Sequence, residues 1–204
     1  MEIVGAEAHY DALIREGHDP ANDPPILARH MDKWDGEPFI DALALSGTSR
    51  VLEIGVGTGR LAKRVLAAGC GHFTGIDLSA PTIRRAQQNL GSWHNVSLIW
   101  GDFMAHGFPD PFDVVYCSLT LFHIADKRRF AGKVEALARQ RFVASIPKQR
   151  ECSLHYGGRM IPLFPDDAEE FGAMLMDAGF GTLHMVEVEF ARIVVAEKQR
   201  AVNE

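Results

Sequence analysis

The segment that most constrains the fold of this chain is residues 51–61, which read VLEIGVGTGRL. A short apolar run leads into three glycines at alternate positions, and a helical pattern begins directly after the third. Glycine allows positive φ angles in a tight turn and lets a ligand approach the backbone closely. In a doubly wound α/β sheet such a loop lies at the carboxyl ends of the strands, where ligands bind. The segment therefore predicts a strand, a ligand-binding loop and a helix, in that order.

From residue 50 onward the chain alternates between apolar runs and helical patterns. Seven runs are typical of strands, at residues 51–54, 73–77, 96–100, 112–119, 142–146, 184–188 and 193–196. Apolar residues at helical spacing predict helices over residues 60–68, 80–90, 126–139 and 166–178. Strands that alternate with helices build parallel sheets, whereas the last two strands follow each other without a helix. We therefore predict an α/β fold with a doubly wound, mostly parallel seven-stranded sheet and one antiparallel strand at or near its edge.

The first 48 residues differ from the rest, because they contain no β-like run and carry a cluster of prolines within residues 20–25. Apolar spacing predicts helices over residues 7–16 and 38–45. Another is predicted to begin at Asp23-Pro24-Pro25, as an N-cap followed by proline in the first turn, and to stop at Gly36, with Trp34 packing along it. A segment of this size is too small to bury a stable core of its own. We interpret residues 1–48 as an N-terminal helical cap on a ligand-binding domain that covers residues 49–204.

The glycine spacing and one acidic residue narrow the kind of ligand. A dinucleotide-binding loop reads G-x-G-x-x-G, but here the third glycine comes one residue early and Arg60 stands in its place. Glu53 lies two residues before the first glycine, where its carboxylate would repel a pyrophosphate. The loop therefore favours a ligand with an ammonium group, and it disfavours a nicotinamide oxidoreductase.

Two further acidic residues follow predicted strands. Asp77 ends the second strand, and a carboxylate there can accept hydrogen bonds from ribose hydroxyls. Asp102 follows the third strand beside Phe103, a pairing that suits the amino group and the ring face of adenine. Each feature alone also fits a helix cap or a structural turn. The loop and both acids, in order at matching strand ends, predict a single binding site.

Together these residues resemble the class I S-adenosylmethionine-dependent methyltransferases over about residues 48–197. Residues 53–59 match the family's first motif, residues 75–79 its second, residues 101–103 its adenine-contact segment, and residues 112–119 its fourth strand. The resemblance implies S-adenosylmethionine as the cofactor, which carries an ammonium group and a sulfonium and has no phosphate. The cofactor-binding residues that it implies are Glu53, Gly55, Gly57, Gly59, Asp77, Leu78, Asp102, Phe103 and Ser118. The family's Asn-Pro-Pro-Tyr or Asp-Pro-Pro-Tyr motif is missing after the fourth strand, which argues against adenine or glutamine amide nitrogens as acceptors.

Two residues outside these motifs are candidates for a role near the reaction. His123 follows the fourth strand, so its imidazole is expected near the reaction centre as a catalytic proton acceptor; a loop histidine bonded to backbone is the alternative. Tyr10 lies on the inner face of the first predicted helix, and it either closes over the cofactor or packs in the core. The polar segment 147–165 either holds substrate or is a solvated connection. The basic run 127–129 is expected to be an exposed helix start.

Composition limits the partners. With 27 acidic residues against 21 basic ones the formal charge is -6, which argues against a nucleic acid as the main partner. Three widely spaced cysteines predict neither a disulfide framework nor a zinc site. No signal peptide and no run of about 18 apolar residues is evident, so we expect no membrane span and a cytoplasmic location. A small-molecule methyl acceptor is the leading hypothesis; a protein or RNA acceptor and a non-catalytic cofactor-binding module are the alternatives.

Overall fold

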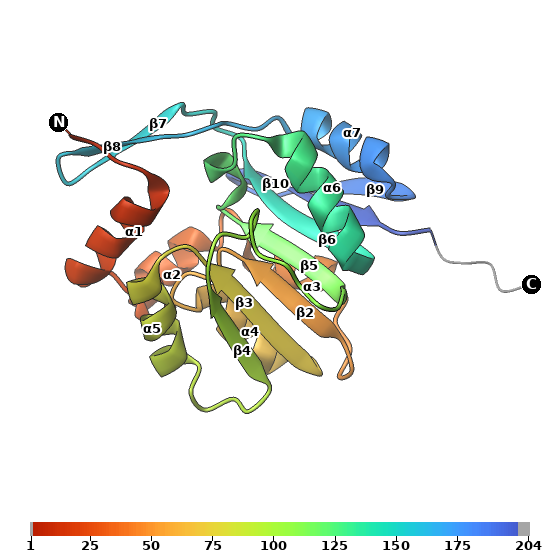
Figure 1. The fold of residues 1–204 in the computed structure, drawn as a ribbon, viewed down its shortest axis with the longest axis horizontal. Helices are drawn as coiled ribbons and strands as arrows, with labels where there is room; N and C mark the ends of the chain where they lie inside the picture. Colours follow the sequence, from red (N-terminus) through yellow and green to blue (C-terminus); the bar gives the residue numbers. More distant parts are fainter. Residues whose placement is uncertain (1, 200–204) are drawn as a thin grey trace, which may run out of the picture.

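The computed structural model describes residues 2–199, and a seven-stranded sheet forms its centre (Figure 1). The strands lie in the order β4-β3-β2-β5-β6-β10-β9. Their bounds are β2 Arg50–Ile54, β3 His72–Asp77, β4 Val96–Trp100, β5 Phe112–Ser118, β6 Ala138–Pro147, β9 Thr182–Glu187 and β10 Ala191–Glu197. β10 pairs antiparallel with β6 and β9, and the other neighbours pair in parallel. The predicted sheet with one antiparallel strand is confirmed.

Helices cover both faces of the sheet, because each helix presents one apolar side to it. One face carries α3 (Gly36–Ala42), α4 (Arg60–Ala68) and α5 (Ala80–Asn89), and the other carries α6 (Lys127–Leu137) and α7 (Ala168–Ala178). In α4 the buried residues Leu61, Val65 and Leu66 recur at helical spacing. β5 is apolar and buried over most of its length, as a parallel strand covered on both faces must be. The two apolar cores therefore lie above and below the central strands.

One connection between helix and strand differs from the expectation. Strand β6 begins at Ala138, directly after α6, whereas the sequence predicted a helix up to residue 139 and a strand only from residue 142. Ala138 adopts an extended conformation, with φ -86° and ψ 120°, and it pairs with Phe112 of β5. The chain therefore passes from helix to strand without a turn, and β6 is longer than predicted.

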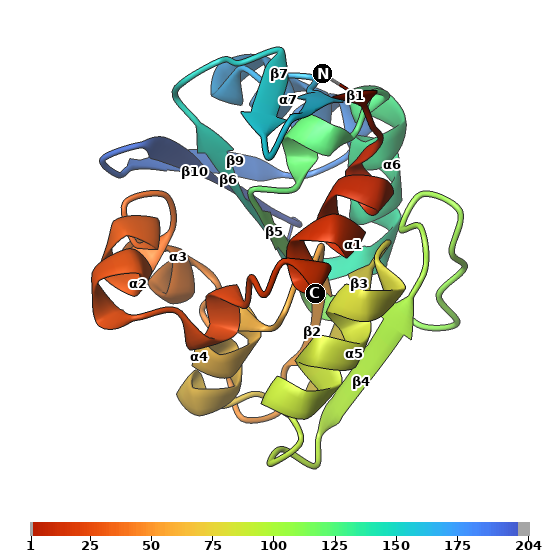
Figure 2. The ribbon, with the colours of Figure 1, turned by 90° about the vertical axis from the view of Figure 1, so that its left-hand side faces the viewer.

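A second sheet of three strands was not predicted. The polar segment expected as a loop contains the hairpin of β7 (Ser153–Tyr156) and β8 (Arg159–Pro162). β1 (Glu2–Ile3) pairs in parallel with β8, which corrects the expectation that the first 48 residues contain no strand. A strand of two residues is too short to show an alternating pattern, so periodicity could not reveal it. Figure 2 shows this small sheet beside α1 (Ala6–Arg15).

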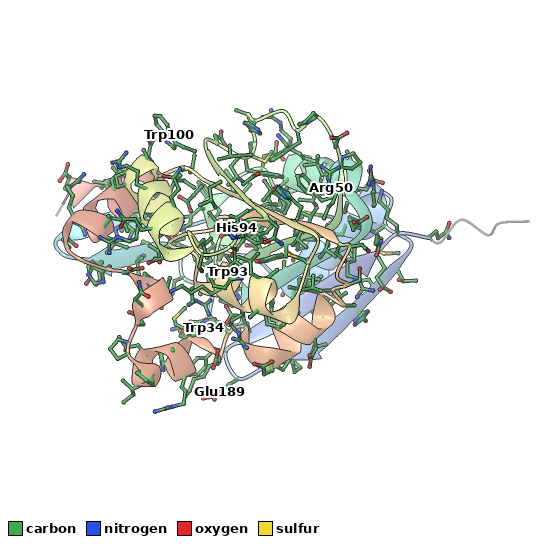
Figure 3. The ribbon with its side chains drawn as sticks, turned by 90° about the horizontal axis from the view of Figure 1, so that it is seen from below. Trp34, Arg50, Trp93, His94, Trp100 and Glu189 are labelled. Carbon is green, nitrogen blue, oxygen red and sulfur yellow. The ribbon has the colours of Figure 1, made fainter. Side chains whose placement is uncertain are left out.

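The N-terminal segment contains the three predicted helices, with changed boundaries. α1 and α2 (Pro25–Met31) lie close to their expected positions, and a short 3-10 turn precedes α2. Gly36 begins α3 instead of ending the preceding helix, because the Asp35 side chain accepts a hydrogen bond from the backbone N–H of Gly36. Trp34 packs against Phe190, with ring centroids 4.8 Å apart, as expected of a packing residue. In Figure 3, Trp34 lies near Glu189 of the turn between β9 and β10.

The structure also shows the state of the cysteines, the arrangement of potential metal ligands and the character of the helices. Cys70 and Cys117 are buried, Cys152 is exposed, and all three are free thiols. Among residues 2–199 no group of three or more histidine, cysteine or acidic side chains is placed to hold a metal ion. No helix of this part of the chain is both long and apolar enough to cross a membrane.

Candidate cofactor and active site

A cleft with a volume of about 300 Å³ opens at the carboxyl ends of the parallel strands. The strands point toward α1, which lies across this edge of the sheet (Figure 1). Ten residues predicted from the sequence line the cleft: Tyr10, Glu53, Gly55, Gly57, Asp77, Leu78, Asp102, Phe103, Ser118 and His123. The cap adds Ala6, Pro20 and Met31 to the wall. The structure therefore brings the ends of four neighbouring strands and the cap together around one cavity.

The glycine loop needs glycine for two different reasons. Gly55 has φ +75°, and a Cβ atom there would lie 2.2 Å from Oγ1 of Thr120, so a side chain would clash. Gly57 has φ +55° with open space beside it, and its N–H donates to Oδ2 of Asp77 at 3.0 Å. Gly59 does not line the cleft; it precedes α4 with φ +95° and packs against Leu90. The first two glycines thus shape the cleft wall, whereas the third shapes the start of the helix.

Glu53 lies at the base of the cleft and is almost completely buried, with 3% of its surface exposed. Its Oε2 accepts a hydrogen bond of 2.8 Å from the phenol of Tyr116. Burial raises the pKa of Glu53 to about 8, although the Tyr116 hydrogen bond and the Arg60 charge oppose that shift. In the protein alone the group is therefore mostly protonated at neutral pH. The repulsion of a pyrophosphate expected from the sequence holds only for its ionised form.

Asp77 lines the cleft and also has the structural role that the sequence offered as the alternative to binding. Its carboxylate lines the cleft, while Oδ1 accepts from the N–H of Ser79 and Oδ2 from the N–H of Gly57, both at 3.0 Å. Burial raises the pKa of Asp77, and these two backbone hydrogen bonds lower it. The side chain therefore joins the glycine loop to the turn after β3, and its remaining lone pairs are available to a ligand.

Another part of the cleft lining is apolar and includes one acid. Phe103 is buried and packs against Phe130, with ring centroids 5.4 Å apart, while Leu78 is partly exposed. Oδ1 of Asp102 accepts from the N–H of Met104 at 2.8 Å, which fixes the turn after β4. This wall offers flat apolar surface beside a carboxylate.

Tyr10 and His123 form a pair across the mouth of the cleft. A hydrogen bond of 2.9 Å joins Oη of Tyr10 to Nε2 of His123, and the two rings meet edge to face. Burial, together with the charges of His9 and Lys127, lowers the pKa of His123 to about 4. Burial also raises the pKa of the Tyr10 phenol well above its usual range. Both side chains are therefore neutral near pH 7.

The short turn that carries His123 is held by Lys127. Its ammonium group donates to the backbone oxygens of Leu121 and Phe164 and pairs with Asp166 at 3.0 Å. The side chain of Lys127 is only 12% exposed, so the expectation of a wholly exposed basic run is wrong at this position. Arg128, in contrast, is largely exposed.

A buried ionic group beside the cleft was missed by reasoning from the sequence. Asp35 is completely buried and accepts hydrogen bonds from both terminal nitrogens of Arg60 and from Oγ of Ser118. Arg60 and Ser118 line the cleft, whereas Asp35 lies behind them. Arg60 was noticed in the sequence only as a departure from the dinucleotide pattern, and no pattern of spacing connects it to an acid in the cap.

Comparison with known proteins finds a family and relatives that are all described as methyltransferases. The family described as "Methyltransferase domain" matches residues 51–140. An uncharacterized methyltransferase of Anoxybacillus flavithermus is 32% identical over 135 residues, 64% of this chain and 58% of that protein. One of Geobacillus thermodenitrificans is 33% identical over 161 residues, 78% of this chain and 62% of that protein. The chain thus spans less than two thirds of either relative's length.

Among solved structures, the fold is similar to magnesium protoporphyrin IX methyltransferase from Synechocystis PCC 6803 with bound SAH. The TM-score is 0.68 at 18% sequence identity, and the match covers 94% of this chain and 95% of the other. A likeness at this identity shows that the two proteins share a fold.

Proposed function

The chain belongs to the class I S-adenosylmethionine-dependent methyltransferases, and we propose that it transfers the methyl group of this cofactor to a small molecule. When bound, the cofactor supplies a methyl group activated by a positively charged sulfur. The observation that carries the proposal is a single cleft lined by a buried carboxyl group, a second acid at the next strand end, and the Tyr10–His123 pair. The first two features suit the cofactor, and the pair suits an acceptor.

The residues of the cleft fit the chemical parts of the cofactor. Glu53 offers a carboxyl group to the ammonium, and Asp77 retains lone pairs that can accept from ribose hydroxyls. Leu78 and Phe103 offer apolar surface to adenine, and Asp102 can accept from its amino group. No cluster of basic side chains for a phosphate is needed, since this cofactor has none.

Tyr10 and His123 are proposed to orient the acceptor. Methyl transfer requires the acceptor atom in line with the bond that breaks, about 3 Å from the methyl carbon. A neutral imidazole can accept a hydrogen bond from an O–H or N–H group of the acceptor and then take up its proton. Because burial keeps His123 neutral, the imidazole does not place a second positive charge beside the sulfonium. The low pKa therefore serves the reaction even though it makes His123 a weak base.

Size and charge favour a small acceptor over a macromolecule. Ligand pockets have volumes of roughly 300–1,000 Å³, and this cleft lies at the lower end of that range. Tyr10 of α1 and Met31 of α2 form part of its wall, so an acceptor must fit between the cap and the strand ends. The net charge of -6 disfavours RNA. One structural neighbour is, by its title, a methyltransferase of magnesium protoporphyrin IX, which is a small molecule.

The proposal is tested by following a labelled methyl group. Purified protein is incubated with methyl-labelled S-adenosylmethionine and with three fractions of a bacterial lysate: small molecules that pass a size filter, total RNA, and total protein. We expect label in the small-molecule fraction, and the labelled compound is then identified by mass spectrometry. Label confined to RNA or to protein would contradict the small-molecule assignment, and no transfer to any fraction would favour a non-catalytic module.

A further inference from the structure

Buried Asp35 and the partly buried Arg60 and Ser118 form a group that lies where the cap meets the glycine loop. Arg60 is the first residue of α4, directly after Gly59, and its side chain is 18% exposed. Asp35 precedes α3, and its carboxylate receives Nη1 of Arg60 at 3.0 Å, Nη2 in a shorter contact, and Oγ of Ser118 at 2.8 Å. The N–H of Gly36 also donates to Asp35, at 2.9 Å. A partly buried cation and a cleft-lining hydroxyl are thus held by one acid from the cap.

We propose that Arg60, held by Asp35, binds the carboxylate of the cofactor's amino-acid end and makes the cleft selective for ligands that carry it. The inference rests on the proposed function only in that S-adenosylmethionine or its product is the ligand. The amino-acid end of that ligand is a zwitterion, with an ammonium group and a carboxylate on the same carbon. The cleft presents a complement to each charge, since Glu53 and Arg60 both line it and the Arg60 charge favours the ionised form of Glu53.

The geometry leaves Arg60 able to bind a second anion. The pair with Asp35 uses one N–H from each terminal nitrogen, and a guanidinium has further N–H donors beyond those two. An arginine in such a place is costly unless an acid compensates its charge, and Asp35 does so from the side away from the cleft. A planar guanidinium fixed by a two-pronged pair also meets a carboxylate in one orientation. Asp35 is therefore a positioning residue, and Arg60 is the binding residue.

A structural role alone would also explain the pair, because it joins the cap to α4. The same helix provides a matched control for that explanation. Arg64, one turn further on, pairs with Asp32 at 2.8 Å and with Glu37 at 2.7 Å, both in the cap. Arg64 joins the same two segments but does not line the cleft. Its removal should therefore weaken the attachment of the cap without changing the choice of ligand.

The experiment compares two probes in four proteins. The probes are S-adenosylhomocysteine and its decarboxylated analogue, which keeps the ammonium group and lacks only the carboxylate. The proteins are the wild type, Arg60→Gln, Arg64→Gln, and the double variant Asp35→Asn with Arg60→Gln. The double variant serves if Arg60→Gln alone fails to fold, because it leaves no unpaired buried charge. Dissociation constants are measured by calorimetry, and circular dichroism checks the fold.

We expect the wild type and Arg64→Gln to bind S-adenosylhomocysteine at least about tenfold more tightly than the analogue, as the loss of a charged hydrogen bond predicts. Arg60→Gln and the double variant should bind both probes about equally, because they lose affinity for the carboxylate-bearing ligand alone. The inference is overturned if these variants keep the wild-type preference, or if both probes lose affinity equally in them. Failure of the wild type to bind either probe would instead remove the proposed cofactor, and this inference with it.

Discussion

Replacing His123 by Gln should lower the turnover number about 100-fold while the dissociation constant for S-adenosylhomocysteine changes by less than about threefold. Acid–base groups of this kind contribute roughly 10²–10⁴-fold, and a base with a pKa of about 4 belongs at the lower end of that range. The glutamine amide can still hydrogen-bond to Oη of Tyr10, which now meets His123 at 2.9 Å, so the cleft should keep its shape. Initial rates with the acceptor identified by methyl labelling provide the measurement.

His18→Gln is the matched control for that variant. His18 bonds to Oη of Tyr156 at 2.7 Å, in the same way that His123 bonds to Tyr10, but it does not line the cleft. The control should retain the wild-type turnover number. A turnover number for His123→Gln within about threefold of the wild type would exclude proton transfer by this residue and leave it a role in packing.

The affinity for S-adenosylhomocysteine should rise about tenfold for each pH unit between about pH 6 and pH 7.5. Burial raises the pKa of Glu53 to about 8, whereas an ammonium ligand binds best to the ionised carboxylate, so binding must remove a proton. The stability of the protein without ligand should show the opposite trend and fall as the pH rises. The stability that Glu53 contributes is complete below its ordinary pKa of about 4.5 and is lost as pH rises through about 8.

Calorimetry across this pH range tests the prediction, together with proton release measured in buffers of different ionisation enthalpy. Glu53→Gln should bind more weakly at pH 7.5 and should lose most of the pH dependence, because an amide does not titrate. Asp102→Asn changes another acid of the same cleft and should keep the full slope. A wild-type affinity that stays constant over the range would show that Glu53 does not change its protonation on binding.

The sequence predicted the sheet and much of the cleft because those features depend on local patterns. Apolar runs identified all seven central strands, and the acids Asp77 and Asp102 stand directly after strands whose carboxyl ends meet at one edge. The glycine spacing also placed Gly55 and Gly57 at the cleft. These predictions needed no knowledge of how distant segments pack.

The features that the sequence could not predict depend on contacts between distant segments and on burial. The pairing of β1 with β8 joins residues more than 150 positions apart, and the sequence of a two-residue strand does not indicate which strand it pairs with. Asp35 meets Arg60 only because the cap folds back onto α4. The pKa shifts of Glu53 and His123 come first from removal of each group from water, a quantity that exists only in the folded chain. The chemical type of the cleft residues was therefore predictable from the sequence, whereas the protonation states of Glu53 and His123 were not.

The most direct test of the central claim is a calorimetric titration of the purified protein with S-adenosylhomocysteine, and separately with NAD, at pH 7.5. The account predicts saturable binding of the first ligand with one site per chain and no measurable binding of NAD. The reason is that the cleft offers a buried carboxyl group and a guanidinium to an amino-acid end, while its glycine loop departs from the dinucleotide pattern. Binding of NAD without binding of S-adenosylhomocysteine would contradict the account.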